Sequence, residues 1–179
     1  MIENLNGIHE TVKYKENSNV KLFINVEVED YPIHWHTPME IIMPLEGSYT
    51  VQIGDDLVHL NESDIIFIAS GVKHRLIAPD TGKRLILQIE WSAVSKIKEL
   101  NSILIAPAIT LTPETSGDIH SNIRKLLLDI SNEYQTDSFL SEAVIYSKML
   151  EVLVLIGRHH TASSCHFNVG RHKQQEYLE

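Results

Sequence analysis

Three histidines and one glutamate in this sequence have the types and the spacing of a metal-binding site. His34, His36 and Glu40 stand in the stretch HWHTPMEIIMPLEG, and His74 closes a second stretch, SDIIFIASGVKH. Imidazole nitrogens and a carboxylate oxygen are good ligands for borderline divalent cations, so we expect these four side chains to hold one Zn²⁺, Ni²⁺, Fe²⁺ or Mn²⁺ ion. The alternative is that the same groups bind a small organic effector by hydrogen bonds to its hydroxyl or carboxylate groups.

Strands are the elements that would position these side chains. Side chains at positions i and i+2 of a strand share a face, so His34 and His36 can point to one place. Pro38 cannot donate a backbone hydrogen bond to a neighbouring strand, which predicts a turn or bulge before Glu40 enters the next strand. We expect His74 to reach the cluster from a separate strand, across the interior of a barrel.

Short strands separated by turns account for the first half of the chain. The first 20 residues are polar and weakly patterned, and we expect an arm with one short strand at 10–14. Alternating or continuous apolar runs predict strands at 21–28, 41–45, 49–53, 64–68, 74–78 and 84–91. The stretch 49–60 reads as a hairpin, because Gly54 and Asp55 tolerate a tight turn. Many short strands without an intervening helix favour a sandwich or barrel, and a jelly roll also protects the sheet edges. The alternative is a β-sandwich that binds no ligand at all.

The spacing of apolar residues becomes helical after Thr112, which is a suitable cap before Pro113. One apolar stripe consists of Ile119, Ile123, Leu126, Leu127, Ile130 and Tyr134. A second helix is predicted over 139–158, and its later part is apolar on nearly every side, so it needs more than one neighbour. We expect an antiparallel two-helix hairpin whose spare surface, within 116–158, forms a homodimer. The alternative is a helix buried within a single chain.

The region from His34 to His74 resembles the two sequence motifs of the cupin superfamily. The first motif, G-x5-H-x-H-x3,4-E-x6-G, is matched at its ligand positions and at Gly47, whereas Val28 replaces the leading glycine. The second, G-x5-P-x-G-x2-H-x3-N, is matched only at Gly71 and His74. The resemblance implies a double-stranded β-helix, that is, a jelly-roll barrel, with the three histidines and the glutamate as ligands. The altered scaffold positions favour a regulator's sensor over a dedicated cupin enzyme.

The order of parts resembles the amino-terminal half of AraC-type transcriptional regulators. The corresponding units are a barrel with its arm at 1–110, a dimerisation hairpin at 111–160, and a linker with the start of a further domain at 161–179. The resemblance implies a small effector in the barrel, and DNA binding only through a carboxy-terminal domain that this sequence lacks. The main alternative is a stand-alone cupin metalloenzyme, a dioxygenase or isomerase, whose metal keeps an open coordination position.

Composition argues against several other classes of protein. A net charge of −9 repels phosphate backbones, and the absence of an 18-residue apolar run predicts no membrane partner. The amino terminus lacks the pattern of a signal peptide, and the single cysteine, Cys165, fits a reducing compartment, so we expect a cytoplasmic protein. No serine or cysteine has a visible base partner, and we therefore expect no catalytic nucleophile.

Overall fold

The computed structural model describes residues 4–16, 18–26, 29–79, 81–100 and 106–163. The strands are β1 (Leu5–Asn6), β2 (His9–Glu10), β3 (Val20–Asn25), β4 (Tyr31–His34), β5 (Met39–Glu46), β6 (Tyr49–Ile53), β7 (Asp56–Leu60), β8 (Ile65–Ile68), β9 (His74–Ile77), β10 (Lys83–Ile89) and β11 (Ala108–Leu111). The helices are a 3-10 turn η1 (Trp91–Ala93), α1 (Pro113–Thr136) and α2 (Ser141–Ser163). The chain is therefore mainly β, with two helices after the last strand, as the sequence predicts.

Nine of these strands form two sheets that pack on each other. The larger sheet has the order β11-β8-β5-β10-β3, the smaller has the order β4-β9-β6-β7, and every paired strand is antiparallel. Their shared interior holds apolar side chains from both sheets: Tyr31, Ile42, Val51, Leu60, Ile66, Ile68, Leu76 and Ile86. This is the two-sheet, jelly-roll-like arrangement that the strand spacing predicts.

Both faces of the larger sheet are buried. On β10, Ile86 faces the smaller sheet, whereas Leu85 and Leu87 belong to the cluster that also contains the helices. On β5, Ile42 and Ile41 are divided in the same way. Because strand side chains alternate between faces, a strand covered on both sides reads as one continuous apolar run. This explains why the sequence of β5 shows no polar alternation.

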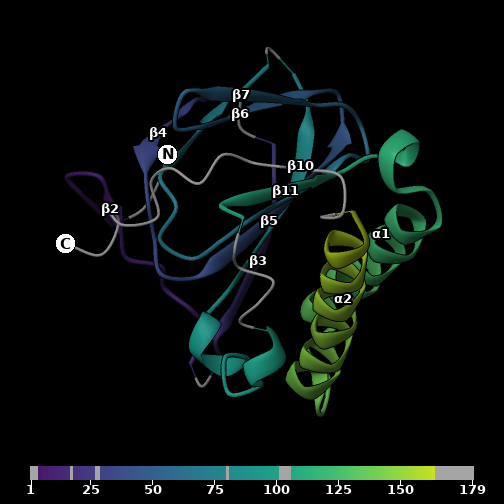
Figure 1. Ribbon diagram of the computed structural model, residues 1–179. Coiled ribbons are helices and arrows are strands. Elements are labelled where there is room, and N and C mark those ends of the chain that lie inside the picture. The colour runs from purple at the N-terminus through teal and green to yellow at the C-terminus, as the bar shows by residue number, and fades with distance from the viewer. Residues whose placement is uncertain (1–3, 17, 27–28, 80, 101–105, 164–179) are drawn as a thin grey trace.

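The two helices lie side by side along the outer face of the larger sheet (Figure 1). Thr112 caps α1 as predicted, because its side chain accepts a hydrogen bond from the Thr115 backbone at 3.1 Å. The expected apolar stripe faces inward, with Ile123, Leu127 and Ile130 fully buried. Helix α1 bends at Gly117, whose φ of 46° lies outside the helical region.

The second helix differs from its predicted bounds at both ends. It begins at Ser141 rather than at residue 139, because Leu140 has a left-handed φ of 67°, and Phe139 is left 92% exposed. It continues to Ser163, so the linker predicted from 161 does not begin there. The rest of that predicted segment, including Cys165, and Val28 of the first motif lie outside the described residues.

Two strand predictions near the ends of the β region were wrong. The arm does not form a strand over 10–14; it folds into the hairpin of β1 and β2, which turns at Gly7 with a φ of 61°. The prediction ended the sheets at Trp91, but Trp91 begins η1 and β11 follows, pairing with β8. The four residues of β11 are too few to show a period of their own, so only the sheet pairing reveals them.

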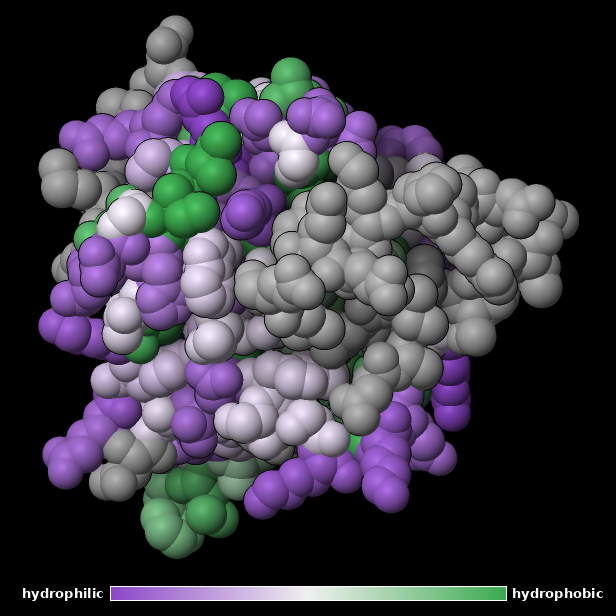
Figure 2. Space-filling model, turned by 60° about the vertical axis from the view of Figure 1, so that its left-hand side comes forward, coloured by the Kyte–Doolittle hydropathy of each residue, from purple (hydrophilic) through white to green (hydrophobic). Residues whose placement is uncertain are grey.

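On one face of the molecule the hydrophobic side chains lie in small, separate groups. Figure 2 shows small hydrophobic groups separated by hydrophilic residues over the described part of that face. Exposed examples in the β strands include Ile33 and Leu57. Isolated hydrophobic residues are ordinary on protein surfaces and do not by themselves indicate a docking face.

Arg84 is a fully buried cation inside the two-sheet interior. It lies between the rings of Tyr31 and Tyr49, with centroid distances of 4.9 and 4.5 Å, and its nitrogens have no hydrogen-bond partner in the described part of the chain. The two aromatic faces attract the guanidinium, but they do not replace the hydrogen bonds that it would make in water.

This environment predicts opposite effects for two substitutions of Arg84. Arg84→Met removes the desolvated charge but keeps most of the volume, so the free energy of unfolding should stay equal or rise. Arg84→Ala also leaves a cavity and should lower it by about 2–4 kcal/mol. Urea denaturation of both variants measures the difference. If the methionine variant loses as much stability as the alanine variant, the charge itself stabilises the fold.

Candidate metal centre

The smaller sheet and the bend that follows β4 bring the three predicted histidines together. His34 ends β4 and His74 begins β9, where they are direct cross-strand partners with ring centroids 4.2 Å apart. His36 follows β4, and one ligand nitrogen from each ring lies within 4.8 Å of the others. Each side chain is at most 2% exposed. The prediction that His74 crosses the barrel interior was wrong, since it stands on the strand next to His34.

Local backbone features hold the two histidine segments against each other. A bend at residues 37–38 separates His36 from β5, as Pro38 predicts. The Gly71 backbone N–H donates to the His36 carbonyl at 2.9 Å, and Gly71 has a φ of +76° that other residues rarely adopt. Gly47, the glycine that ends the first motif, has the same φ. A Cβ at this position would lie 3.3 Å from the Thr81 carbonyl oxygen.

Each histidine is oriented by a backbone carbonyl. In all three rings Nδ1 lies 2.9 Å from the oxygen, in the pairs His34–Pro32, His36–Pro38 and His74–Val72. A carbonyl oxygen only accepts hydrogen bonds, so Nδ1 must carry the proton. The neutral form of each ring therefore presents an Nε2 lone pair to the centre of the cluster. Metal-binding histidines use the same arrangement to fix their tautomer.

Glu40 reaches the cluster from the larger sheet. Its Oε2 lies 3.2 Å from His36 Nε2, and its Oε1 lies 3.4 Å from His74 Nε2. Gln88 on β10 donates to Glu40 Oε2 at 2.7 Å. Sequence analysis missed Gln88, although its parity with Arg84 and Ile86 on an apolar strand marks it as an inward polar residue.

A second carboxylate, that of Glu10, was also missed. Glu10 Oε2 lies 3.5 Å from His34 Nε2, and the residue is only 6% exposed. It belongs to β2 of the amino-terminal arm. The arm sequence shows no alternation that would have placed one of its residues in the interior, so no sequence signal pointed to it.

The charges of the cluster are strongly coupled. Burial, followed by the charge of His74, lowers the pKa of His34 from 6.5 to about 4. Burial alone would lower the pKa of His36 and raise that of Glu40, but their mutual hydrogen bond and opposite charges outweigh it. The pKa of His36 is therefore raised, and that of Glu40 is held well below its usual value. The Glu40 carboxylate thus favours a proton on His36 in the metal-free protein.

The cluster has the chemistry that a divalent cation needs. Two of its buried atoms, Glu40 Oε1 and His74 Nε2, have no hydrogen-bond partner among the described residues. Three Nε2 atoms and a carboxylate oxygen form a mixed nitrogen and oxygen donor set, which suits Zn²⁺, Ni²⁺, Fe²⁺ and Mn²⁺ alike. The four predicted residues are thus brought together in space, while their role as metal ligands stays a prediction.

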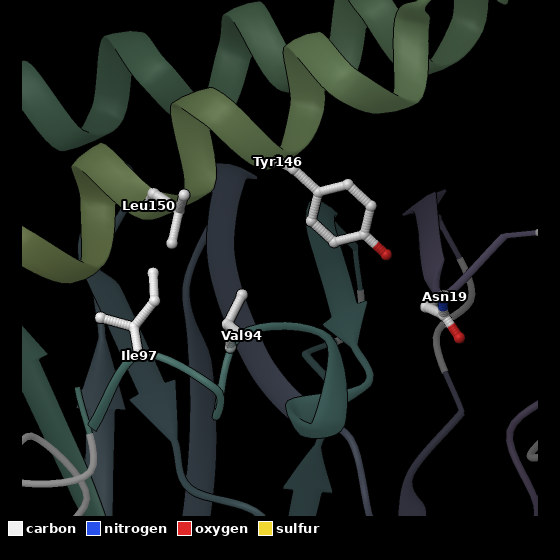
Figure 3. Close-up of a pocket in the computed structure, with 5 residues that line it drawn as sticks. All are labelled: Asn19, Val94, Ile97, Tyr146 and Leu150. Atoms are coloured by element: carbon white, nitrogen blue, oxygen red, sulfur yellow. The ribbon is translucent and has the colours of Figure 1, made fainter. Parts of the chain in front are cut away.

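A separate hollow lies between α2 and the β region. Its volume is about 320 Å³. Figure 3 shows the residues that line it: Asn19, Val94, Ile97, Tyr146 and Leu150. None of the four predicted site residues contributes to it, and its lining is largely aliphatic. It therefore offers no alternative metal site.

The low pKa of His34 predicts a pH effect on the metal-free protein. Unfolded His34 takes up a proton near pH 6.5 and folded His34 only near 4, so stability should fall as the pH falls through this window. The pKa of His36 is raised, so its stabilising contribution is complete below pH 6.5 and declines only at higher pH. The raised pKa of buried Glu10 opposes the trend, because a carboxyl group that protonates more easily when folded gains stability as the pH falls.

Comparison with His34→Asn isolates the contribution of this residue. Between pH 6.5 and 4.5, chelator-treated wild type should lose about 2 kcal/mol more unfolding free energy than the variant. Urea denaturation at both pH values measures these losses. Equal losses in the two proteins would contradict the assignment of a neutral His34.

A family model for the cupin domain matches residues 23–89. Among curated proteins, the uncharacterized HTH-type transcriptional regulator YobQ of Bacillus subtilis is 25% identical over 134 residues, which cover 70% of this chain and 56% of that protein. The uncharacterized HTH-type transcriptional regulator YdeC of the same organism is 34% identical over 55 residues, which cover 30% of this chain and 19% of that protein. The chain thus spans only part of the length of either relative.

Solved structures include a similar cupin-2 domain protein from Shewanella frigidimarina. It is 19% identical, covers 42% of this chain and 74% of its own, and superposes with a TM-score of 0.38. Helices α1 and α2 lie after the region that the family model matches. Among the described residues, neither helix has the length and hydrophobicity of a membrane-spanning segment. The two packed sheets, the histidine cluster and the family match lead to one conclusion: residues 23–89 of this chain form a cupin domain.

Proposed function

We propose that this chain is the sensing and dimerisation part of an AraC-type transcription regulator, and that its cupin site responds to a divalent metal ion. The observation that carries the proposal is the similarity to YobQ. Its 134 aligned residues extend well beyond the 23–89 cupin match, so the likeness to an HTH-type regulator includes parts outside the barrel. Because the chain spans only part of these relatives, DNA binding would belong to residues outside this sequence.

The closed surroundings of the cluster support sensing over catalysis. All three histidines and Glu40 are at most 2% exposed, whereas an enzyme must admit a substrate to its metal. A bound cation would supply Lewis acidity, and with an open position it would activate water or dioxygen. A stand-alone metalloenzyme, a dioxygenase or isomerase, is therefore the second candidate. The convergence of three Nε2 atoms favours it, and the burial of the cluster opposes it.

One strand provides a physical link between the site and the helices. On β5, Glu40 faces the cluster, whereas its neighbours Met39 and Ile41 pack in the core shared with α1 and α2. A shift of Glu40 on metal binding would therefore move atoms that support the helix layer. Such coupling requires that the metal bind the two arrangements with different free energies.

The helices would form the homodimer contact within residues 116–158, as an antiparallel hairpin. Leu128 and Val154 are 36% and 39% exposed, which leaves apolar surface on both helices. We place such a regulator in the cytoplasm. A single cysteine cannot form a disulfide within the chain and fits this reducing compartment, and the DNA target of a bacterial regulator is found there.

Metal analysis tests the site. Purified protein should contain about one transition metal ion per chain, because the donor set is complete, and a His34→Ala/His74→Ala double variant should contain none. His59→Ala, at an exposed histidine of the same small sheet, should keep the metal. A metal-free wild type, or a double variant that retains the metal, would refute the proposed metal site.

Sedimentation tests the sensing role. The chain should dimerise, and the metal should change the dimer dissociation constant by roughly 5- to 150-fold, which is the usual range of coupling between two sites. Leu128→Glu/Val154→Glu should weaken the dimer, whereas Leu57→Glu, at a 65% exposed position of β7, should not. The enzyme alternative would be established instead if the chain stays monomeric under all conditions and, when loaded with metal, consumes dioxygen or turns over a substrate.

A further inference from the structure

The amino-terminal arm is joined by its backbone to the segment between two of the histidines. The Trp35 N–H donates to the Ile8 carbonyl at 2.9 Å, and the Glu10 N–H donates to the Trp35 carbonyl at 3.0 Å. His9 and Trp35 form a parallel bridge, and their rings lie 4.3 Å apart. Trp35 therefore packs against the arm and is only partly buried.

This docking places Glu10 at the cluster. Successive side chains of a strand point to opposite sides, so His9 covers Trp35 while Glu10 turns inward. Its Oε2 lies 3.5 Å from His34 Nε2. The hydrogen bond from His34 Nδ1 to the Pro32 carbonyl leaves Nε2 with a lone pair, and a carboxylate oxygen also presents lone pairs. Two such atoms attract each other only through a cation or a proton between them.

We propose that Glu10 is a further protein ligand of the metal, supplied by the arm, so that three imidazoles and two carboxylates surround one divalent ion. This inference rests on the metal site of the proposed function. The charges support it, because two buried carboxylates and three neutral imidazoles need two positive charges for balance, which one divalent ion provides.

The additional ligand has two consequences. Five protein donors exceed the four of a tetrahedral Zn²⁺ site, and a set with two carboxylates suits a six-coordinate ion such as Mn²⁺, Fe²⁺ or Ni²⁺. The metal would also fasten the arm, because the Glu10 side chain would bind the metal while the backbones of Glu10 and of nearby Ile8 bond to Trp35. At most one coordination position would then remain for water or a small effector.

Titration of the metal-free chain with Co²⁺ tests this ligand. Glu10→Gln keeps the shape but removes the anionic oxygen, and it should weaken Co²⁺ binding at least about tenfold and change the Co²⁺ absorption spectrum. Glu16→Gln removes the same charge at an exposed arm position and should behave as wild type. Circular dichroism of each metal-free variant controls for folding.

Hydrogen exchange provides a readout that is independent of affinity. Saturating Co²⁺ should slow exchange of the Glu10 and Trp35 amides at least about tenfold in wild type, and not in Glu10→Gln. If Glu10→Gln binds Co²⁺ as tightly as Glu16→Gln, with the same spectrum, Glu10 is no ligand. The proposed site then stands if His34→Ala still abolishes binding. If wild type itself takes up no Co²⁺, the Glu10 inference and the metal part of the proposed function both fail.

Discussion

The burial of both faces of the larger sheet is the constraint on which the rest of this structure depends. One face packs against the smaller sheet, the other against two helices, so every strand in the middle must be apolar on both sides. The buried polar residues of these middle strands are Glu40 and Gln88, which belong to the interior cluster, and Arg84, which lies away from it. The same constraint makes β5 common to the site and to the helix layer, because Glu40 faces the cluster while Met39 and Ile41 pack in the core that contains the helices.

The cost of burying charge explains the arrangement of the cluster. Ionised groups are tolerated in an apolar interior when they are paired. Glu40 is paired with His36, and Gln88 donates to the same carboxylate oxygen, Oε2. The backbone carbonyls that hold each Nδ1 add no charge, yet they fix where the lone pairs point. Arg84 lies roughly 13 Å along β10 from Gln88, by strand geometry, and has only aromatic faces for compensation. The interior therefore contains a carboxylate with hydrogen-bonding partners at one level and, at another, a cation without them.

The sequence revealed those parts of the site whose spacing is local. His34 and His36 are two residues apart, and Glu40 follows one bend later, so strand parity and a proline sufficed to bring them together. The contact of these residues with His74 depends on the pairing of β4 with β9, which no local sequence pattern encodes. The prediction therefore placed His74 across the barrel interior rather than on the strand next to His34. The position of Glu10 could not be predicted from the sequence at all. Its position follows from a tertiary backbone contact with Trp35, made by an arm whose residues show no period.

The connection of the arm bears on the choice between sensor and enzyme. A catalytic metal needs a path for substrate and a vacant coordination position, and both are reduced when a buried carboxylate from a separate segment lies 3.5 Å from a ligand nitrogen. A sensor gains from the same contact. An ion bound to residues of the arm, of β4 and of β5 at once would favour whichever arrangement of these segments it bound more tightly. Under the proposed function, the contact that restricts access to the site would therefore also give metal binding a structural effect.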